Sequence, residues 1–300
     1  MIEARRLHIL RAVADHGTVT AAAAALYLTP SAVSQQLAAL EQETGHKLVE
    51  RGAKGVRLTP AGEILLRHTN AVLAQLERAE AELAAYSTGA AGTVTLASFA
   101  TGINLVVGPA LAGLGRTAPG IRVRVLDAEG DASLPMVLDR QVDIAVAVEY
   151  RGAPGADDPR LSRVPLYEEP FDAVLPVLHR LAGAERVALE ELAKDTWIGP
   201  YPGNPCHDVV VLACEHAGFQ PQFEHSSDDF RAVVALAQAG AGVALVPRSA
   251  LHGMDLTDVA VRPVDSVAPT RKVFAAVRHG AEEHPLLRPV LDALGAAAAR

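Results

Sequence analysis

The chain has 300 residues, of which half are hydrophobic, and it carries a formal net charge of −8 at pH 7. A chain of this length forms two or three folding units, and their cores must be aliphatic because aromatic residues make up only 4% of the sequence. The charged N-terminus and the lack of an apolar run of about 18–20 residues argue against a secretion signal and a membrane span, so we expect a cytoplasmic protein without membrane contact.

The charge is distributed unevenly along the chain. Residues 1–65 carry seven Lys or Arg and six Asp or Glu, a net charge of +1, which leaves −9 for the remainder. Four of these seven cations lie between Lys47 and Arg57. Because salt limits the reach of distant charges to about 8–10 Å, a local basic edge can bind phosphate on an otherwise acidic protein.

The first 60 residues contain the start and stop signals of three short helices. Apolar residues recur at helical spacing, and Thr18 and Thr29 are each placed to cap the helix that follows, with Pro30 in the first turn of the third. Gly52 and Gly55 loosen the turn of a segment with strand character. The expected elements are helices over about residues 3–16, 19–26 and 30–44 and a two-stranded wing over 48–58.

A long helix is expected to begin at Thr59-Pro60 and to run to about Tyr86, which is roughly 40 Å at 1.5 Å per residue. Its apolar positions alternate in steps of four and three, as in the seam of a coiled coil: Leu65, Thr69, Val72, Leu76, Ala79, Leu83 and Tyr86. The alternative is an amphipathic helix packed on its own domain. We favour a dimerisation helix, because a helix of this length between two domains has little of its own chain to bury against.

Beyond a hinge of small residues at 87–92, strands and helices alternate. Expected strands cover residues 93–98, 121–127, 144–149, 161–167, 171–176, 196–199, 223–225, 243–247 and 272–277. Expected helices cover residues 101–117, 133–140, 206–217 and 229–239, with a last helix from about 285. Alternation of this kind implies βαβ units and a parallel sheet.

Many residues of the first segment stand in one fixed register: Leu7, Ala21-Ala22, Leu26, Thr29, Ala32-Val33-Ser34, Leu37, Leu40-Glu41, Gly45, Leu48, Arg51 and Leu58-Thr59-Pro60-Ala61-Gly62. On these residues, segment 1–65 resembles the N-terminal domain of LysR-type transcriptional regulators. Pro119-Gly120, Asp143-Ile144-Ala145 and the run 233–247 are similar to that family's effector-binding domain. The family domain resembles a periplasmic binding protein, with two α/β lobes and a cleft between them.

The resemblance implies a mixed fold. A winged helix-turn-helix DNA-binding domain would cover residues 1–59, a dimerisation linker helix 60–88 and a two-lobed α/β effector-binding domain 89–300. Lobe I would comprise about 93–165 and 270–300, and lobe II about 166–269. The family usually forms tetramers built from coiled-coil dimers and binds interrupted inverted repeats near promoters. The expected partners are therefore double-stranded promoter DNA, a small-molecule effector and further copies of the chain, and a contact with RNA polymerase is left open.

The third helix is expected to enter the major groove N-terminus first. Gln35 is the best candidate base reader, because its amide can pair with N6 and N7 of adenine. The expected DNA contacts are Thr29, Pro30, Ser31, Ser34 and Gln35 on the helix and Arg51, Lys54 and Arg57 in the wing. A merely solvated helix face is the alternative. Many family members carry Gln-Pro where this chain has Pro30-Ser31, and Arg is common where it has Gln35, so no operator can be transferred from relatives.

Effector contacts are expected at the carboxyl ends of strands and at helix N-termini, where ligands bind in open α/β folds. The residues selected by this rule are Ser98, Thr101, Glu149, Tyr201, Asn204, Asp228 and Pro247. Thr101 is also expected to cap its helix. Capping and turn chemistry are the alternative for each of these residues alone. Glu149 and the acids at 228–229 favour a ligand with an amine, although surface exposure explains them equally well.

The two cysteines, Cys206 and Cys214, allow an alternative function as a thiol-based redox switch. Peroxide-sensing members of the family carry two cysteines in a similar region, with a spacing that differs by a residue. On an intact helix the two thiols would be roughly 12 Å apart along the axis, too far for a disulfide, so switching would require local unfolding. Two small core residues are the simpler explanation.

A catalytic function is not expected. Cys206 and His207 are adjacent on a predicted helix, so their side chains diverge, and the sequence has no phosphate loop, dinucleotide fingerprint or zinc signature. We therefore expect no catalytic residue, no metal and no cofactor. Residues 93–300 alone would also suit the solute-binding protein of a transporter, but that class predicts an export signal and leaves the N-terminal segment unexplained.

Overall fold

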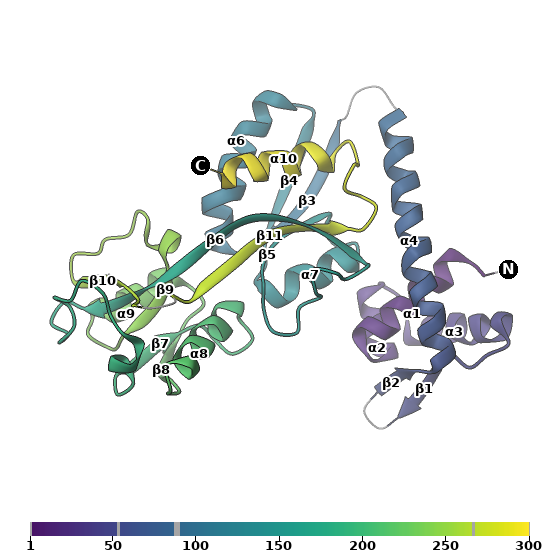
Figure 1. Cartoon of the computed structure of the whole chain (residues 1–300). Coiled ribbons are helices and arrows are strands. Elements are labelled where there is room, and N and C mark those ends of the chain that lie inside the picture. Colours follow the sequence, from purple (N-terminus) through teal and green to yellow (C-terminus); the bar gives the residue numbers. More distant parts are fainter. Residues whose placement is uncertain (1, 53–54, 87–90, 266–267, 300) are drawn as a thin grey trace.

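The structure is a computed structural model that describes residues 2–52, 55–86, 91–265 and 268–299 (Figure 1). A small helical head at the N-terminus is joined by one long helix to a larger α/β domain. Four residues of the predicted hinge, 87–90, and the wing residue Lys54 lie outside the described residues.

The head consists of three helices and a two-stranded wing: α1 Ala4–His16, α2 Val19–Ala25, α3 Pro30–Thr44, β1 Val49–Gly52 and β2 Gly55–Leu58. The predicted caps form, since Thr18 accepts from the Ala21 amide (3.0 Å) and Thr29 from the Ala32 amide (3.2 Å). The inward faces of the helices meet in an aliphatic core that includes Leu10. Local capping and helical periodicity therefore define the head as predicted.

The wing packs on the turn between α1 and α2. Gly17 ends α1 in a left-handed conformation (φ 66°), and its carbonyl oxygen accepts from the Val56 amide at 2.7 Å. A Cβ atom on Gly55 would lie 2.5 Å from that same oxygen, and the φ of Gly55 is 117°. Glycine at position 55 therefore permits both the turn of the wing and its close approach to the helices.

Helix α4 covers Pro60–Tyr86, the range predicted from the sequence. One of its faces, which includes Leu73, Glu77 and Ala81, is buried against the α/β domain. A Cβ atom on Gly280 would lie only 2.2 Å from the carbonyl oxygen of Ala74, which shows how closely the two parts approach. The expectation that α4 has little of its own chain to bury against was therefore wrong.

The α/β domain has two lobes that share two long strands. In lobe I, β3 Gly92–Ser98 is flanked in parallel by β4 Ile121–Asp127 and β5 Ile144–Val148. A continuous helical segment, α5 Ala100–Gly102, a π-helical turn Ile103–Val107 and α6 Gly108–Thr117, covers one face together with α10 Leu287–Ala298. Helix α7 Gly130–Leu138 covers the other face, as separate hydrophobic clusters on the two faces show.

Lobe II is packed around β7 Thr196–Gly199 and β8 Gln222–Ser226, which pair in parallel. Its helices α8 Pro205–His216 and α9 Phe230–Gln238, together with β9 Ala244–Pro247, enclose a core that contains Trp197 and both cysteines. Strand β10 Val259–Pro263 also belongs to this lobe and was not expected from the sequence.

The strand β6 Leu161–Pro176 connects the lobes. The sequence predicted two strands, 161–167 and 171–176, separated at Glu168-Glu169-Pro170, but the pairing with β11 Thr270–Arg278 continues through Pro170. From Phe171 onward, β6 pairs with β9 and β10 instead. Because β6 and β11 are antiparallel to their neighbours, the sheet is mixed rather than parallel as predicted.

Candidate functional site

The exposed face of α3 carries the polar residues expected to meet DNA. Val33, Leu37 and Leu40 are buried in the head, which turns the opposite side of the helix outward. Thr29, Pro30, Ser31 and Gln35 are exposed there, and Ser34 is half-buried. The amides of the first helical turn lie at the same end, so this surface combines hydrogen-bond donors with an adaptable amide side chain.

The wing brings one guanidinium group to this helix. Arg51 on β1 donates a hydrogen bond to Ser34 Oγ on α3 at 3.3 Å, so the two elements form one surface. Arg57 on β2 is exposed and stands opposite Glu50 in the ladder. Lys47 is bound to Glu41 at 2.9 Å, so the basic edge is less positive than the sequence count indicates.

A second candidate site is a cavity of about 680 Å³ between the two lobes. Residues from both lobes and from the shared strand β11 form its wall, including Phe99, Thr101, Asp127, Glu129, Asn204, Cys206, Asp228, Asp229, Arg231, His252 and Arg271. A volume of this size is within the range of small-molecule sites.

The structure brings together three of the seven predicted effector residues, Thr101, Asn204 and Asp228, on the wall of this cavity. The other four do not line it. Ser98 is fully buried and donates to the Phe99 carbonyl, and Pro247 is buried at the end of β9. Glu149 is exposed beside Arg163, and Tyr201 is 55% exposed outside the wall.

Thr101 has a different role from the predicted cap. Phe99 occupies the N-cap position of α5, and Thr101 stands inside the helix, where its Oγ1 accepts from Arg271 Nη2 at 2.9 Å. Asn204, in contrast, caps α8 through the Cys206 amide at 2.9 Å. Its side-chain nitrogen also donates to Glu129 of lobe I (3.3 Å) and Asp228 of lobe II (3.1 Å), so Asn204 links the two lobes at the cavity.

Arg271 lines the cavity from the shared strand β11 and is only 1% exposed. Its Nε donates to Glu169 Oε1 at 2.7 Å, and the guanidinium carbon is 5.1 Å from the centre of the Phe99 ring. A buried charge needs such an ion pair, because removing it from water uncompensated is strongly unfavourable. The sequence offered one signal for this residue: Arg271 shares the alternating face of β11 with the buried residues Val273 and Ala275.

The rim of the cavity is acidic. The pKa of Glu129 is raised to about 7, first by burial and then by the neighbouring carboxylates Asp228 and Asp127, while Arg271 and the hydrogen bond from Asn204 oppose the rise. Asp127 is the last residue of β4 and Glu129 lies two residues beyond it, so the strand-end rule that selected the other residues would have found both had it been applied to this strand. The carboxylates on the cavity wall therefore carry more negative charge than the neighbouring cations neutralise.

Both cysteines lie on α8, as predicted, and both are buried. Burial raises the pKa of the Cys206 thiol, although Arg271 Nη1, 3.7 Å from its sulfur, opposes that rise. Burial raises the pKa of Cys214 to about 12. Both thiols are therefore held in the protonated, less nucleophilic form in this conformation.

Within the described ranges, no three or more His, Cys, Asp or Glu residues are grouped so that they could hold a metal ion. The same part of the chain contains no helix with the length and apolar character that a membrane crossing requires.

Comparisons with known proteins match both parts of the chain, the head and the α/β domain. The family model for bacterial regulatory helix-turn-helix proteins of the lysR family matches residues 4–63, and that for the LysR substrate binding domain matches residues 87–299. A probable hydrogen peroxide-inducible genes activator of Mycobacterium avium is 31% identical over 241 residues, which are 80% of this chain and 76% of the relative. The regulator AlsR of Bacillus subtilis is 26% identical over 300 residues, covering 96% of this chain and 93% of that protein.

Solved structures share the fold. A Corynebacterium glutamicum OxyR mutant covers 98% of this chain and 91% of its own, with a TM-score of 0.62 and 23% identity. Full-length CbnR in complex with its target DNA covers 99% and 100%, with a TM-score of 0.56 and 23% identity. The family consists of transcriptional regulators rather than enzymes. The chain belongs to the LysR family of transcriptional regulators, with a DNA-binding head joined to an effector-binding domain.

Proposed function

We propose that α3 reads promoter DNA in the major groove and that the wing holds the adjacent backbone. The observation that carries this proposal is the outward face of α3, where Gln35 is exposed and Ser34 is joined to Arg51 of the wing. Gln35 would select adenine through two hydrogen bonds, whereas Thr29, Pro30, Ser31, Arg57 and Lys54 would position the head.

Binding to duplexes selected from a random pool tests these roles. Replacing Gln35→Ala should relax base preference at one position by about 1–3 kcal/mol, because a bidentate contact is lost. Replacing Arg51→Ala should weaken binding to all duplexes alike and lower the salt dependence, because one phosphate contact is lost. Gln222→Ala and Arg122→Ala, both exposed and remote from the head, are the matched controls. Unchanged selectivity and salt dependence would remove the assignment.

The cavity between the lobes is proposed as the effector site, for a small molecule that carries a positively charged group. Three acids at the rim, Asp127, Glu129 and Asp228, support this chemistry, since a cation would compensate their charge. Arg271 offsets them only in part, because it is already paired with Glu169. Closure of the lobes on the ligand would shift the population of conformations of the regulator.

A thermal-shift panel tests the ligand class, with putrescine, agmatine and arginine set against acetate, succinate and benzoate. We expect the amines to raise the melting temperature, and Glu129→Gln or Asp228→Asn to weaken that response about tenfold in concentration, roughly 1.4 kcal/mol. Glu283→Gln, an exposed carboxylate of lobe I, serves as the matched control. A response to the carboxylates alone would refute the proposed class.

A thiol-based redox switch is the second candidate. It is favoured by the approach of Arg271 to the Cys206 sulfur and by the M. avium relative, which is described as peroxide-inducible. The burial of both cysteines on an unbroken helix counts against it. Titration of free thiols before and after peroxide treatment tests this function. If both thiols of the wild-type protein remain free after peroxide, the redox switch is refuted.

Dimerisation through α4 is proposed from three apolar seam residues that a single chain leaves exposed, Val72, Leu76 and Leu83. Thr69, another seam position, is buried within the chain, so the contact would use only part of the predicted seam. We also propose that the DNA-binding domain ends near residue 59 and that the linker helix ends near residue 88, where the effector-binding domain begins. Two such dimers would assemble into a tetramer. Sedimentation of the intact chain measures the assembly state.

A further inference from the structure

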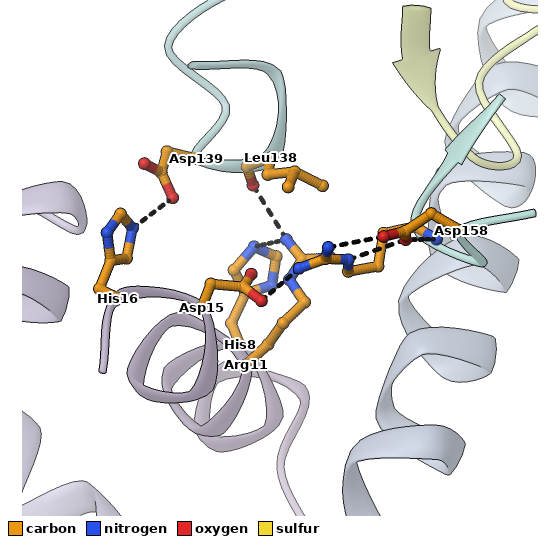
Figure 2. Close-up of polar contacts among 8 residues, drawn as sticks. His8, Arg11, Asp15, His16, Leu138, Asp139 and Asp158 are labelled. Atoms are coloured by element: carbon orange, nitrogen blue, oxygen red, sulfur yellow. Dashed lines mark hydrogen bonds and ion pairs between the residues drawn. The ribbon is translucent and has the colours of Figure 1, made fainter. Parts of the chain in front are cut away.

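The head is seated directly on lobe I. Helix α1 carries Arg11, whose side chain is largely buried and donates from Nη2 to the Leu138 carbonyl at 3.0 Å. One turn further on, His16 Nε2 lies 3.1 Å from an oxygen of Asp139. Leu138 and Asp139 are at the C-terminal end of α7, and Figure 2 shows both contacts. The DNA-binding head and the effector domain therefore meet at one end of a single helix.

A second group of ion pairs holds the head on lobe I at the same place. We call the contacts of α1 with residues 138–139 and Arg160 the seat of the head. Asp15 of α1 pairs with Arg160 of lobe I, and Arg160 in turn binds Asp158 at 2.7 Å. Helix α3 takes no part in these contacts and lies on the far side of the head in Figure 1. The seat therefore leaves the proposed DNA-reading surface accessible while it sets the direction in which that surface points.

Helix α4 is tied to this end of α7 as well. Glu77 is buried and accepts from Arg140, which follows α7, and from Arg278 Nε of β11 at 2.9 Å. Arg278 also donates to the carbonyl of Val137, the penultimate residue of α7, at 3.3 Å. Since a buried carboxylate cannot lose such partners cheaply, a movement of the end of α7 must be followed by α4 and the head or must break this network.

The opposite end of α7 lies at the effector cavity. Its N-cap is Glu129, which lines the cavity and contacts Asn204 of lobe II. Nine residues separate this end from the head, a length of about 13 Å, and the buried residues Leu134 and Val137 hold the helix on the sheet. One short, well-packed helix thus touches the cavity at its first turn and the head at its last.

We propose that α7 is the connection through which the effector cavity controls the seating of the DNA-binding head on lobe I. An occupant that draws Glu129 toward lobe II shifts α7 along or about its axis. The shift changes the contacts of Leu138 and Asp139 with α1, and it thereby changes the direction of α3. The inference rests on the proposed effector function of the cavity, but the connection is a property of the protein that mutation can test without a ligand.

Hydrogen–deuterium exchange of the full-length protein measures the connection. Glu129→Gln, at the cavity end, should change exchange in α1 by about threefold or more, because it alters how α7 supports the seat. Asp139→Asn combined with Arg160→Gln weakens the seat, and in that background the effect of Glu129→Gln on α1 should disappear. Glu283→Gln supplies the same change of charge at an exposed position of lobe I and should leave α1 unchanged.

Anisotropy of a labelled duplex provides a second readout. The seat variant should change DNA affinity without loss of helix content, and Glu129→Gln should change affinity only while the seat is intact. If Glu129→Gln alters exchange around the cavity but not in α1, or alters α1 equally in the seat variant, the connection is refuted. Either result would refute the connection without affecting the proposed effector site. Conversely, if the mutations confirm the connection but no amine raises the melting temperature, only the proposed ligand class is refuted. Should Glu129→Gln fail to fold, Glu129→Asp, which draws back the carboxylate, replaces it.

Discussion

The acidic rim makes a quantitative prediction for Glu129→Gln. A carboxyl group whose pKa is higher in the folded than in the unfolded protein lowers stability as the pH rises, because the unfolded chain loses its proton more readily. For Glu129 this loss begins above its usual pKa of 4.5 and is complete above about 7. Glutamine keeps the shape of the protonated side chain but cannot ionise, so the variant should escape the loss.

The size of the effect follows from the pKa values. The difference between 4.5 and about 7, at roughly 1.4 kcal/mol for each pH unit, amounts to about 3.5 kcal/mol. Glu129 is only partly buried, so solvent screening reduces this to about 1–2 kcal/mol. At about 2–4 °C for each kcal/mol in a chain of this size class, the variant should melt several degrees above the wild type at pH 8.5.

Melting curves of both proteins between pH 4 and 8.5 provide the assay. The difference in melting temperature should be small near pH 4, below the usual pKa of Glu129, and should grow until about pH 7.5. Glu283→Gln, whose carboxylate is exposed, controls for the change in net charge. A difference that does not vary with pH, or a variant less stable than the wild type at pH 8.5, would refute the assigned pKa and its cause.

Three further changes test the contacts of α4, two within the chain and one with a second copy of it. Glu77→Ala leaves two arginines without their buried partner and should lower the free energy of unfolding by about 2–4 kcal/mol in urea titrations, whereas the exposed Glu80→Ala should have little effect. Gly280→Ala should destabilise by more than about 1 kcal/mol, because its Cβ would overlap α4, while Gly295→Ala, in open space on a helix, should stabilise slightly. Leu76→Asp should shift sedimentation toward monomer without altering the fold; an unchanged assembly state would contradict the proposed seam.

Features that depend on neighbouring residues could be predicted from the sequence. The caps at Thr18 and Thr29, the inward residues of α3 and the length of α4 follow from spacing within one or two helical turns. The cavity was only partly predictable. The strand-end rule selected Thr101, Asn204 and Asp228, but it also selected Ser98 and Pro247, whose side chains the tertiary packing buries.

Ion pairs between residues far apart in the sequence determined the features that the sequence did not predict. From the sequence, Glu169 lies in a gap between two predicted strands. In the structure Arg271, 102 residues later, pairs with Glu169, and β6 continues through this position from one lobe into the other. Glu77 on α4 is likewise buried where Arg140 and Arg278, distant in sequence, bind it. The sequence alone determined the family and the local elements, because capping and periodicity are short-range effects. Only the tertiary structure decided the buried Arg271–Glu169 pair at the cavity and the contacts of the head with lobe I, because a buried charge is tolerated only where folding brings its partner.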